Sequence, residues 1–146
     1  MKWVTRARPK TDRIACPWLI LRFIDPQAEI DYVPANEVLA YAKDHGAHSF
    51  DAPGAEFTHR DGKCTFEVLV DEFGIEDAAV HRLAAIVHGA DIEGALATTP
   101  QSAGLLAVAE GFREIEEDDL RSLALQLPVY DALYAWARLQ EPSTRT

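Results

Sequence analysis

The sequence predicts an α+β fold that is mainly helical and carries a small antiparallel sheet or hairpin. Three observations lead to this prediction. Apolar residues recur at helical spacing between positions 77 and 88, at Val80, Leu83, Ala84 and Val87. Strand-like alternation is confined to short runs, such as residues 30–33. Asp61-Gly62 is a strong turn signal between residues that favour strands, so we expect a hairpin over residues 57–67.

The first half of the chain is expected to alternate short strands with helices. A strand at residues 3–5 leads into a basic connection. Pro17 suits a first helical position because its missing N–H would have no partner there, so a helix is expected to begin near it and to end at residues 25–26. A strand at 30–33, a helix from 36 to about 43 and a strand at 49–51 follow.

The second half is expected to be helical after the hairpin. Asp77 is a good N-cap and Gly89 a C-terminal stop for the helix between them. Further helices are expected at 101–110 and 120–127, and Pro128 is expected to start the last one. The tail from about residue 141 is polar. No linker divides the chain, so we expect one domain over residues 1–146.

The composition of the chain favours some classes of function over others. The 146 residues are 48% hydrophobic, which is enough for one ordinary core. A formal net charge of −10 argues against direct nucleic-acid binding, which relies on cations that neutralise phosphates. Up to residue 25, however, the balance is +4. This basic segment could receive an anion or could dock on the protein's own carboxylates, and both interpretations stay open.

The sequence also predicts where in the cell the protein is found. No run of about 18 apolar residues could span a bilayer, and the N-terminus lacks the apolar region of a secretory signal. The two cysteines, Cys16 and Cys64, form no CxxC pair. We therefore expect free thiols and a cytoplasmic protein with no membrane association.

A divalent metal site is one hypothesis for the chemistry. His59 lies beside the predicted turn, and His88 and Asp91 lie near the end of the helix predicted between residues 77 and 88. One zinc, iron or manganese ion could bind these three side chains, with Glu56 or Glu67 completing the site. The alternative is that the histidines are hydrogen-bonded core residues. Cys64 is a secondary candidate ligand.

Thiol chemistry is the competing hypothesis. Cys16 is expected near the start of the first helix, close to Arg13, where the helix dipole and a cation both favour a thiolate. Cys16 or Cys64 would then be a nucleophile, with His59 as base. The alternative is that Cys16 is simply buried. No glycine-rich phosphate loop or dinucleotide fingerprint occurs.

Residues 2–6, 8–10, 12–20 and 23–26 form four characteristic runs near the N-terminus. On these runs the chain resembles the C-terminal domain of ChrB-type chromate-resistance proteins, and the resemblance extends from Lys2 to about Arg138. It continues through Phe50-Asp51, Pro53-Gly54, His59, Cys64-Thr65-Phe66, Phe73-Gly74, Gly89-Ala90-Asp91, Ala103-Gly104-Leu105 and Tyr130-Asp131-Ala132-Leu133-Tyr134.

The resemblance implies a part in chromate tolerance, as sensor, regulator or reductase. Chromate is a tetrahedral dianion, so Arg6, Arg8 and Arg13 become candidate oxyanion ligands, with Asp12 beside them. Two functions remain open: a small metal-dependent or thiol-assisted oxidoreductase that uses Cys16 and Arg13, and a non-catalytic regulatory domain that senses an oxyanion or binds a partner. A homo-oligomer or a regulatory partner protein is compatible with either.

Overall fold

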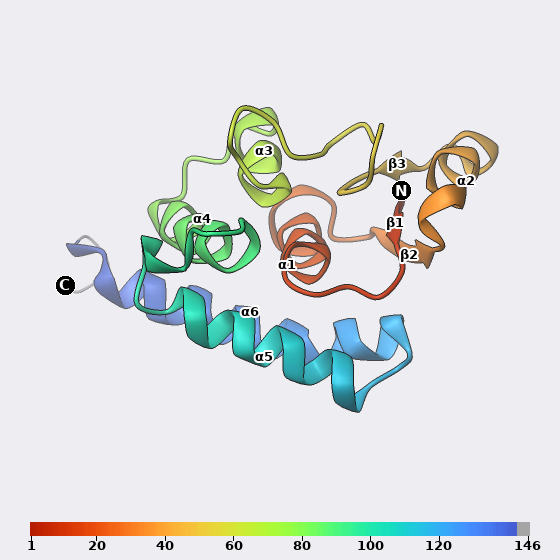
Figure 1. Ribbon diagram of the computed structural model, residues 1–146. Coiled ribbons are helices and arrows are strands. Elements are labelled where there is room, and N and C mark those ends of the chain that lie inside the picture. The colour runs from red at the N-terminus through yellow and green to blue at the C-terminus, as the bar shows by residue number, and fades with distance from the viewer. Residues whose placement is uncertain (143–146) are drawn as a thin grey trace.

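The computed structural model describes residues 1–142, and they form a helical body with a small sheet at one end (Figure 1). The strands are β1 (Lys2–Arg6), β2 (Glu29–Val33) and β3 (His48–Ser49). The α-helices are α1 (Asp12–Leu19), α2 (Val38–His45), α3 (Thr65–Glu72), α4 (Ala78–Asp91), α5 (Ser102–Ile115) and α6 (Asp119–Gln140). Short helical turns η1 (Ile20–Ile24), η2 (Ala35–Glu37) and η3 (Leu96–Thr98) join them.

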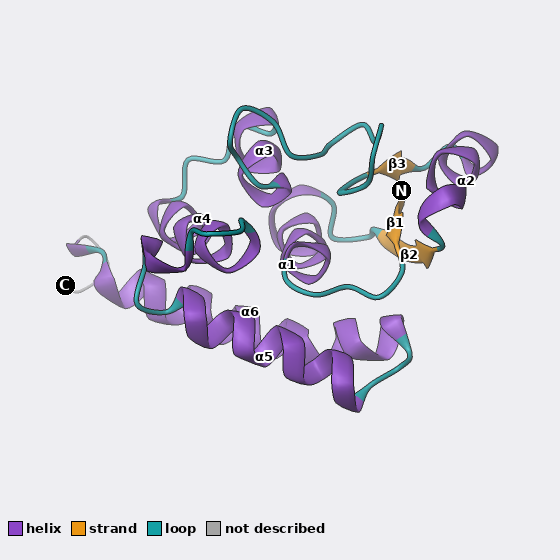
Figure 2. Ribbon diagram, in the orientation of Figure 1, coloured by secondary structure: helices purple, strands orange, loops and turns teal. Residues whose placement is uncertain are grey.

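The sheet has the order β2-β1-β3 and every pairing in it is parallel. Trp3 in the central strand pairs with Ile30 on one side and His48 on the other. The prediction of an antiparallel sheet was therefore wrong, although the mainly helical α+β character is present. The reason is the connection: α1 lies between β1 and β2, and α2 lies between β2 and β3, and such crossovers return the chain in the same direction. Figure 2 shows the three strands gathered beside α2.

The predicted hairpin over residues 57–67 is only half present. Arg60 and Lys63 form an isolated antiparallel bridge around the Asp61-Gly62 turn, as the turn signal indicates. The second limb, however, is the helix α3 rather than a strand. Its first turn is stabilised because Glu67 accepts the backbone N–H of Cys64 at 3.0 Å, which satisfies a donor that a helix start leaves open.

Two prolines lie inside helices rather than at their starts. Pro17 is the sixth residue of α1, and Pro128 lies within the 22-residue α6, so the expected breaks at these positions are wrong. Proline donates no hydrogen bond to the carbonyl four residues earlier. In α1 that carbonyl belongs to Arg13, and it accepts the hydroxyl of Tyr32 at 2.6 Å instead. A tertiary contact thus compensates for the missing helical bond.

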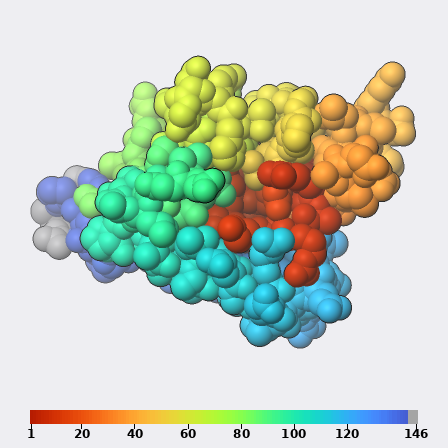
Figure 3. Space-filling view, viewed as in Figure 1, coloured from red at the N-terminus to blue at the C-terminus, as the bar shows by residue number. Residues whose placement is uncertain are grey.

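The core is organised around α1. Figure 1 shows α1 between α3 and α4 on one side and α5 and α6 on the other, and α1 is in contact with α3, α4 and α6. Its buried face carries Trp18, and Trp3, Phe50, Phe66 and Tyr130 complete the largest side chains of the core. The space-filling view shows the N-terminal segment enclosed by later parts of the chain (Figure 3). No helix among residues 1–142 is long and apolar enough to cross a membrane.

Candidate functional site

A charged pocket of about 300 Å³ lies where the end of β1, the start of α1 and the end of α4 meet. Four kinds of side chain line it: cations, carboxylates, a histidine and a threonine. The lining residues are Arg6, Lys10, Thr11, Asp12, Arg13, Asp51, His59, Asp91 and Arg113. We call this the cationic pocket. It contains five residues that the sequence nominated for anion or metal binding, namely Arg6, Asp12, Arg13, His59 and Asp91.

Asp12 connects the pocket to α3. Its carboxylate is fully buried and accepts the backbone N–H of Thr65 at 2.7 Å and that of Phe66 at 3.1 Å. These are two of the donors that the first turn of α3 leaves without helical partners. Burial raises the pKa of Asp12, and the carboxylates of Asp91 and Asp51 raise it further. Asp12 therefore fixes the start of α3 against α1.

His59 lies among three acceptors. Its Nε2 is 2.9 Å from Asp91 Oδ2, and its Nδ1 is 3.0 Å from Thr65 Oγ1 and 3.3 Å from Asp51 Oδ1. The hydrogen bonds to Asp51 and then to Asp91 raise the pKa of His59 from 6.5 to about 10. At neutral pH the ring is an imidazolium with both N–H groups engaged by acidic partners.

Asp51 ties the same network to the basic segment. Its backbone is in the left-handed region, with φ of 49°, and its carbonyl accepts Nε of Arg6 at 2.9 Å. Its carboxylate is 3.8 Å from Nη1 of Arg13. Although burial alone would raise the pKa of Asp51, the hydrogen bond from His59 and the charge of Arg13 bring it below its usual value. Asp51 is therefore an ionised carboxylate between two cations.

The three predicted oxyanion ligands are not equivalent. Arg6 and Arg13 line the cationic pocket, whereas Arg8 is not among its lining residues. Arg8 has a φ of 60°, and its Nη2 donates to the carbonyl of Arg113 at 2.9 Å. Arg8 also supports the pocket indirectly, because its own carbonyl accepts Nη2 of Arg13 at 2.8 Å.

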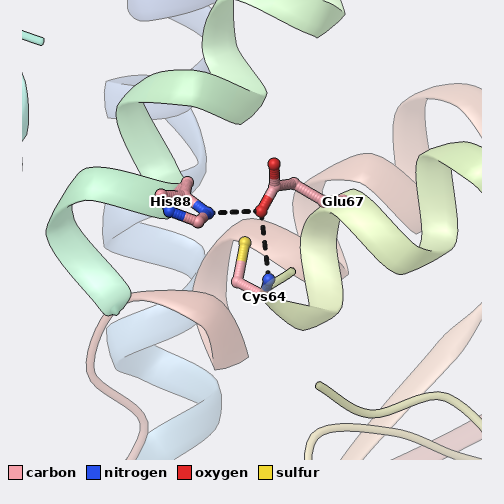
Figure 4. Close-up of side chains that lie close together, drawn as sticks. All are labelled: Cys64, Glu67 and His88. Atoms are coloured by element: carbon pink, nitrogen blue, oxygen red, sulfur yellow. Dashed lines mark hydrogen bonds and ion pairs between the residues drawn. The ribbon is translucent and has the colours of Figure 1, made fainter. Parts of the chain in front are cut away.

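The expected metal set of His59, His88, Asp91 and Glu56 is divided among three places. His59 and Asp91 lie together, and Asp12 joins them. His88 instead contacts Glu67, with 2.6 Å between Nδ1 and Oε1, in a separate cluster with Cys64 (Figure 4). Glu56 pairs with Nδ1 of His48 at 3.0 Å. His88 and Asp91 are only three residues apart on α4, but His88 contacts Glu67 of α3 whereas Asp91 contacts His59.

Of the two alternatives for Cys16, the structure agrees with the buried one. Cys16 is the fifth residue of α1 rather than its start, and it is fully buried. Its Sγ donates to Asp12 Oδ1 at 3.3 Å. Burial raises the pKa of this thiol well above its ordinary value, and the charge of Asp12 raises it further. Cys64 is also fully buried, and burial likewise raises the pKa of its thiol. Both groups are thiols at neutral pH.

Sequence reasoning missed four residues of the cationic pocket: Lys10, Thr11, Asp51 and Arg113. Asp51 had a local signal, because it lies just before the Pro53-Gly54 turn at the end of a strand. Lys10 belonged to the basic segment that the charge balance had already singled out. No local signal in the sequence indicates Arg113, because it reaches the pocket from α5, about a hundred residues after the start of α1.

Comparison with known proteins places the chain in a family. The family model described as "ChrB, C-terminal domain" matches residues 3–137. A curated relative, "Protein ChrB" of Cupriavidus metallidurans, is 39% identical over 136 residues, which cover 91% of this chain and 40% of the relative. The chain thus spans less than half of that relative's length. No solved structure matches the chain. The chain belongs to the family of ChrB C-terminal domains.

Proposed function

We propose that this domain binds a small tetrahedral oxyanion of the chromate class in the cationic pocket. The observation that carries the proposal is the convergence of four cationic side chains from three parts of an otherwise acidic chain. Arg6 is at the end of β1, Lys10 and Arg13 flank the start of α1, and Arg113 belongs to α5. Arginine forks are suited to the oxygens of a dianion because they donate two directed hydrogen bonds.

The electrostatics of Arg13 support an anion in this position. Burial lowers the pKa of Arg13, and the neighbouring cation Arg6 lowers it further. Arg113 acts in the same direction, and Asp51 opposes it. Cations that repel one another in a partly enclosed site are stabilised when an anion binds between them. A bound oxyanion would therefore relieve a repulsion that the protein otherwise tolerates.

Two polar atoms without partners are also found on this lining. Thr11 Oγ1 and Arg13 Nε are buried and lack a hydrogen-bond partner among residues 1–142. Buried polar groups normally have partners, and those that do not often belong to a site completed by water, an ion or a ligand. Both residues line the cationic pocket, so a ligand there is a natural candidate to complete their hydrogen bonding.

Binding accounts for the site better than thiol-assisted reduction does. Reduction of an oxyanion needs an electron donor, and the two thiols are buried with raised pKa values. His59 already uses both ring nitrogens on carboxylates and Thr65. The side chains of the pocket are thus arranged to bind an anion rather than to reduce it. Such an arrangement suits a sensing or regulatory domain.

Calorimetric titration of the intact chain with chromate, and with sulfate as a redox-inert analogue, tests the proposal. We expect both anions to bind with an affinity that falls as salt is added. Arg13→Ala is expected to weaken binding by roughly tenfold to a hundredfold, since a hydrogen bond to a charged group contributes about 1.5–3 kcal/mol. Arg121→Ala is the matched control, because Arg121 is exposed and pairs with Glu116 away from the pocket. No binding at millimolar anion would contradict the proposal.

A metal-dependent enzyme is the second candidate function. Asp12, His59 and Asp91 each offer a ligand atom, and these atoms lie within 4.8 Å of one another. Histidine and carboxylate ligands suit zinc, iron or manganese. The ion would have to displace the proton from His59 and overcome the four nearby cations, so we rank this function second. Stoichiometric metal in the chain purified without chelator, lost in His59→Ala, would favour it over anion binding.

A further inference from the structure

A second cluster of ligand-type side chains lies outside the cationic pocket. Cys64 precedes α3, Glu67 is in the first turn of α3, and His88 is near the end of α4 (Figure 4). Each offers one ligand atom, and the three atoms lie within 4.8 Å of one another. Glu67 Oε1 is the central atom: it accepts Cys64 N–H at 3.0 Å and lies 2.6 Å from His88 Nδ1.

We propose that Cys64, Glu67 and His88 form a binding site for a zinc ion, independent of the anion in the cationic pocket. A thiolate, an imidazole and a carboxylate are the three ligand types that Zn²⁺ takes in proteins. A thiolate ligand also disfavours magnesium and calcium, which prefer oxygen. Three protein ligands leave the fourth tetrahedral position for water.

The arrangement gives the ion both a buried ligand and access from solvent. Cys64 is fully buried, whereas the side chains of Glu67 and His88 are 23% and 24% exposed. A hollow of about 170 Å³, lined in part by Glu67, Lys63 and Asp71, opens beside the carboxylate. Figure 4 shows the thiol and the imidazole approaching the same carboxylate from different sides. An ion at this point would lie within reach of all three ligand atoms once Glu67 Oε1 and His88 Nδ1 move apart from their hydrogen-bond distance.

The local backbone also prepares the ligands. Because Cys64 is the N-cap of α3, the helix dipole favours negative charge on its sulfur once a cation is present. The hydrogen bond from Cys64 N–H holds the carboxylate of Glu67 in place. Without a cation, burial keeps the Cys64 pKa raised, so the group is a thiol.

The proton balance of binding follows from these states. One Zn²⁺ displaces the thiol proton of Cys64, which passes to solvent, and it binds Nδ1 of His88 in the neutral tautomer that carries its proton on Nε2. Metal affinity is therefore expected to fall as the pH is lowered, because protons compete for the same atoms. The oxidation states of the metal and of the sulfur do not change.

Cobalt substitution tests this site with a signal specific to sulfur coordination. The intact chain, stripped of metal with a chelator, is titrated with Co²⁺ and the near-ultraviolet thiolate-to-cobalt charge-transfer band is recorded. We expect the band to saturate at one ion per chain and to disappear when Zn²⁺ is added. His88→Ala should weaken binding by at least about a hundredfold, since even the loss of an outer-shell partner costs about 10- to 100-fold. Cys64→Ser should abolish the band.

Matched controls separate this site from the alternatives. Serine is a good N-cap, so Cys64→Ser is expected to fold, and circular dichroism checks this. His81→Ala, on the same helix, and Cys16→Ala, the other buried thiol, should retain the band. Absence of the band in the folded wild type would overturn the proposal. Metal binding that is lost in His59→Ala but retained in His88→Ala would also overturn it, because the ion would then belong to the cationic pocket.

Discussion

The cationic pocket and the Cys64–Glu67–His88 cluster both depend on the start of α3 and the end of α4, but they differ in chemistry. At the start of α3, Thr65 hydrogen-bonds His59 and Asp51 of the pocket, whereas its neighbour Cys64 belongs to the cluster. The end of α4 supplies Asp91 to the pocket and His88 to the cluster. One helix–helix contact thus presents two different sets of ligands.

The two sites differ in the charged side chains that other parts of the chain contribute to them. The pocket also receives cations from β1, the start of α1 and α5, so its net character suits an anion. The cluster holds a thiol, an imidazole and one carboxylate, which suit a cation. Asp12 supports both, because it binds the backbone of Thr65 and Phe66 and so fixes the start of α3. Substitutions can therefore affect both sites together or one alone.

Asp12→Ala is expected to have the largest effect and to damage both sites. It leaves the backbone N–H groups of Thr65 and Phe66 without their acceptor in a buried region. Each buried donor left unpaired costs about 1–3 kcal/mol, so we expect the free energy of unfolding to fall by roughly 2–6 kcal/mol. Urea unfolding measures this loss, and Asp71→Ala, at an exposed ion pair with Lys63, should lose no more than about 1 kcal/mol. Equal losses in the two variants would contradict the role of Asp12.

Gly89→Ala is expected to have a smaller effect that disturbs the end of α4. A Cβ at Gly89 would clash with Ser102 Oγ and would lie 2.7 Å from Ser102 Cβ, so α5 would have to move away. We expect a loss of about 1–3 kcal/mol, because overpacking outweighs the helical preference of alanine.

Gly111→Ala is the control for this prediction. Gly111 lies within α5, and a Cβ there would meet nothing within 4 Å. This variant should gain up to about 1 kcal/mol from helix propensity alone. Thermal unfolding compares the two variants, and a stabilised Gly89→Ala would show that α4 and α5 are not closely packed at this point.

Local signals in the sequence predicted some features well. The cap at Asp77 is present, with its carboxylate accepting from Ala79 and Val80, but the predicted stop at Gly89 is wrong because α4 continues through it to Asp91. The Asp61-Gly62 turn was also predicted correctly. These features depend on residues close in sequence or on the strong periodicity of one helix.

Other features depend on contacts that the sequence does not display. The parallel sheet follows from how α1 and α2 return the chain, and β-propensity is the same for either direction. The second limb of the expected hairpin has residues that favour strands, yet contacts to Asp12 and Glu67 stabilise it as a helix. His88 was placed with His59 because spacing along α4 cannot reveal that Glu67 approaches one face of that helix.

The pH dependence of His59 gives the smallest expected effect and isolates the pocket from the cluster. The pKa of His59 is about 10 in the folded chain and 6.5 when unpaired, so folding favours the protonated ring. The stability that this contributes is fully present below pH 6.5 and is lost as the pH rises towards about 10. We therefore expect the difference in melting temperature between the wild type and His59→Gln to shrink steadily over this range. A difference that stays constant or grows with pH would show that His59 is not held as an imidazolium between Asp51 and Asp91.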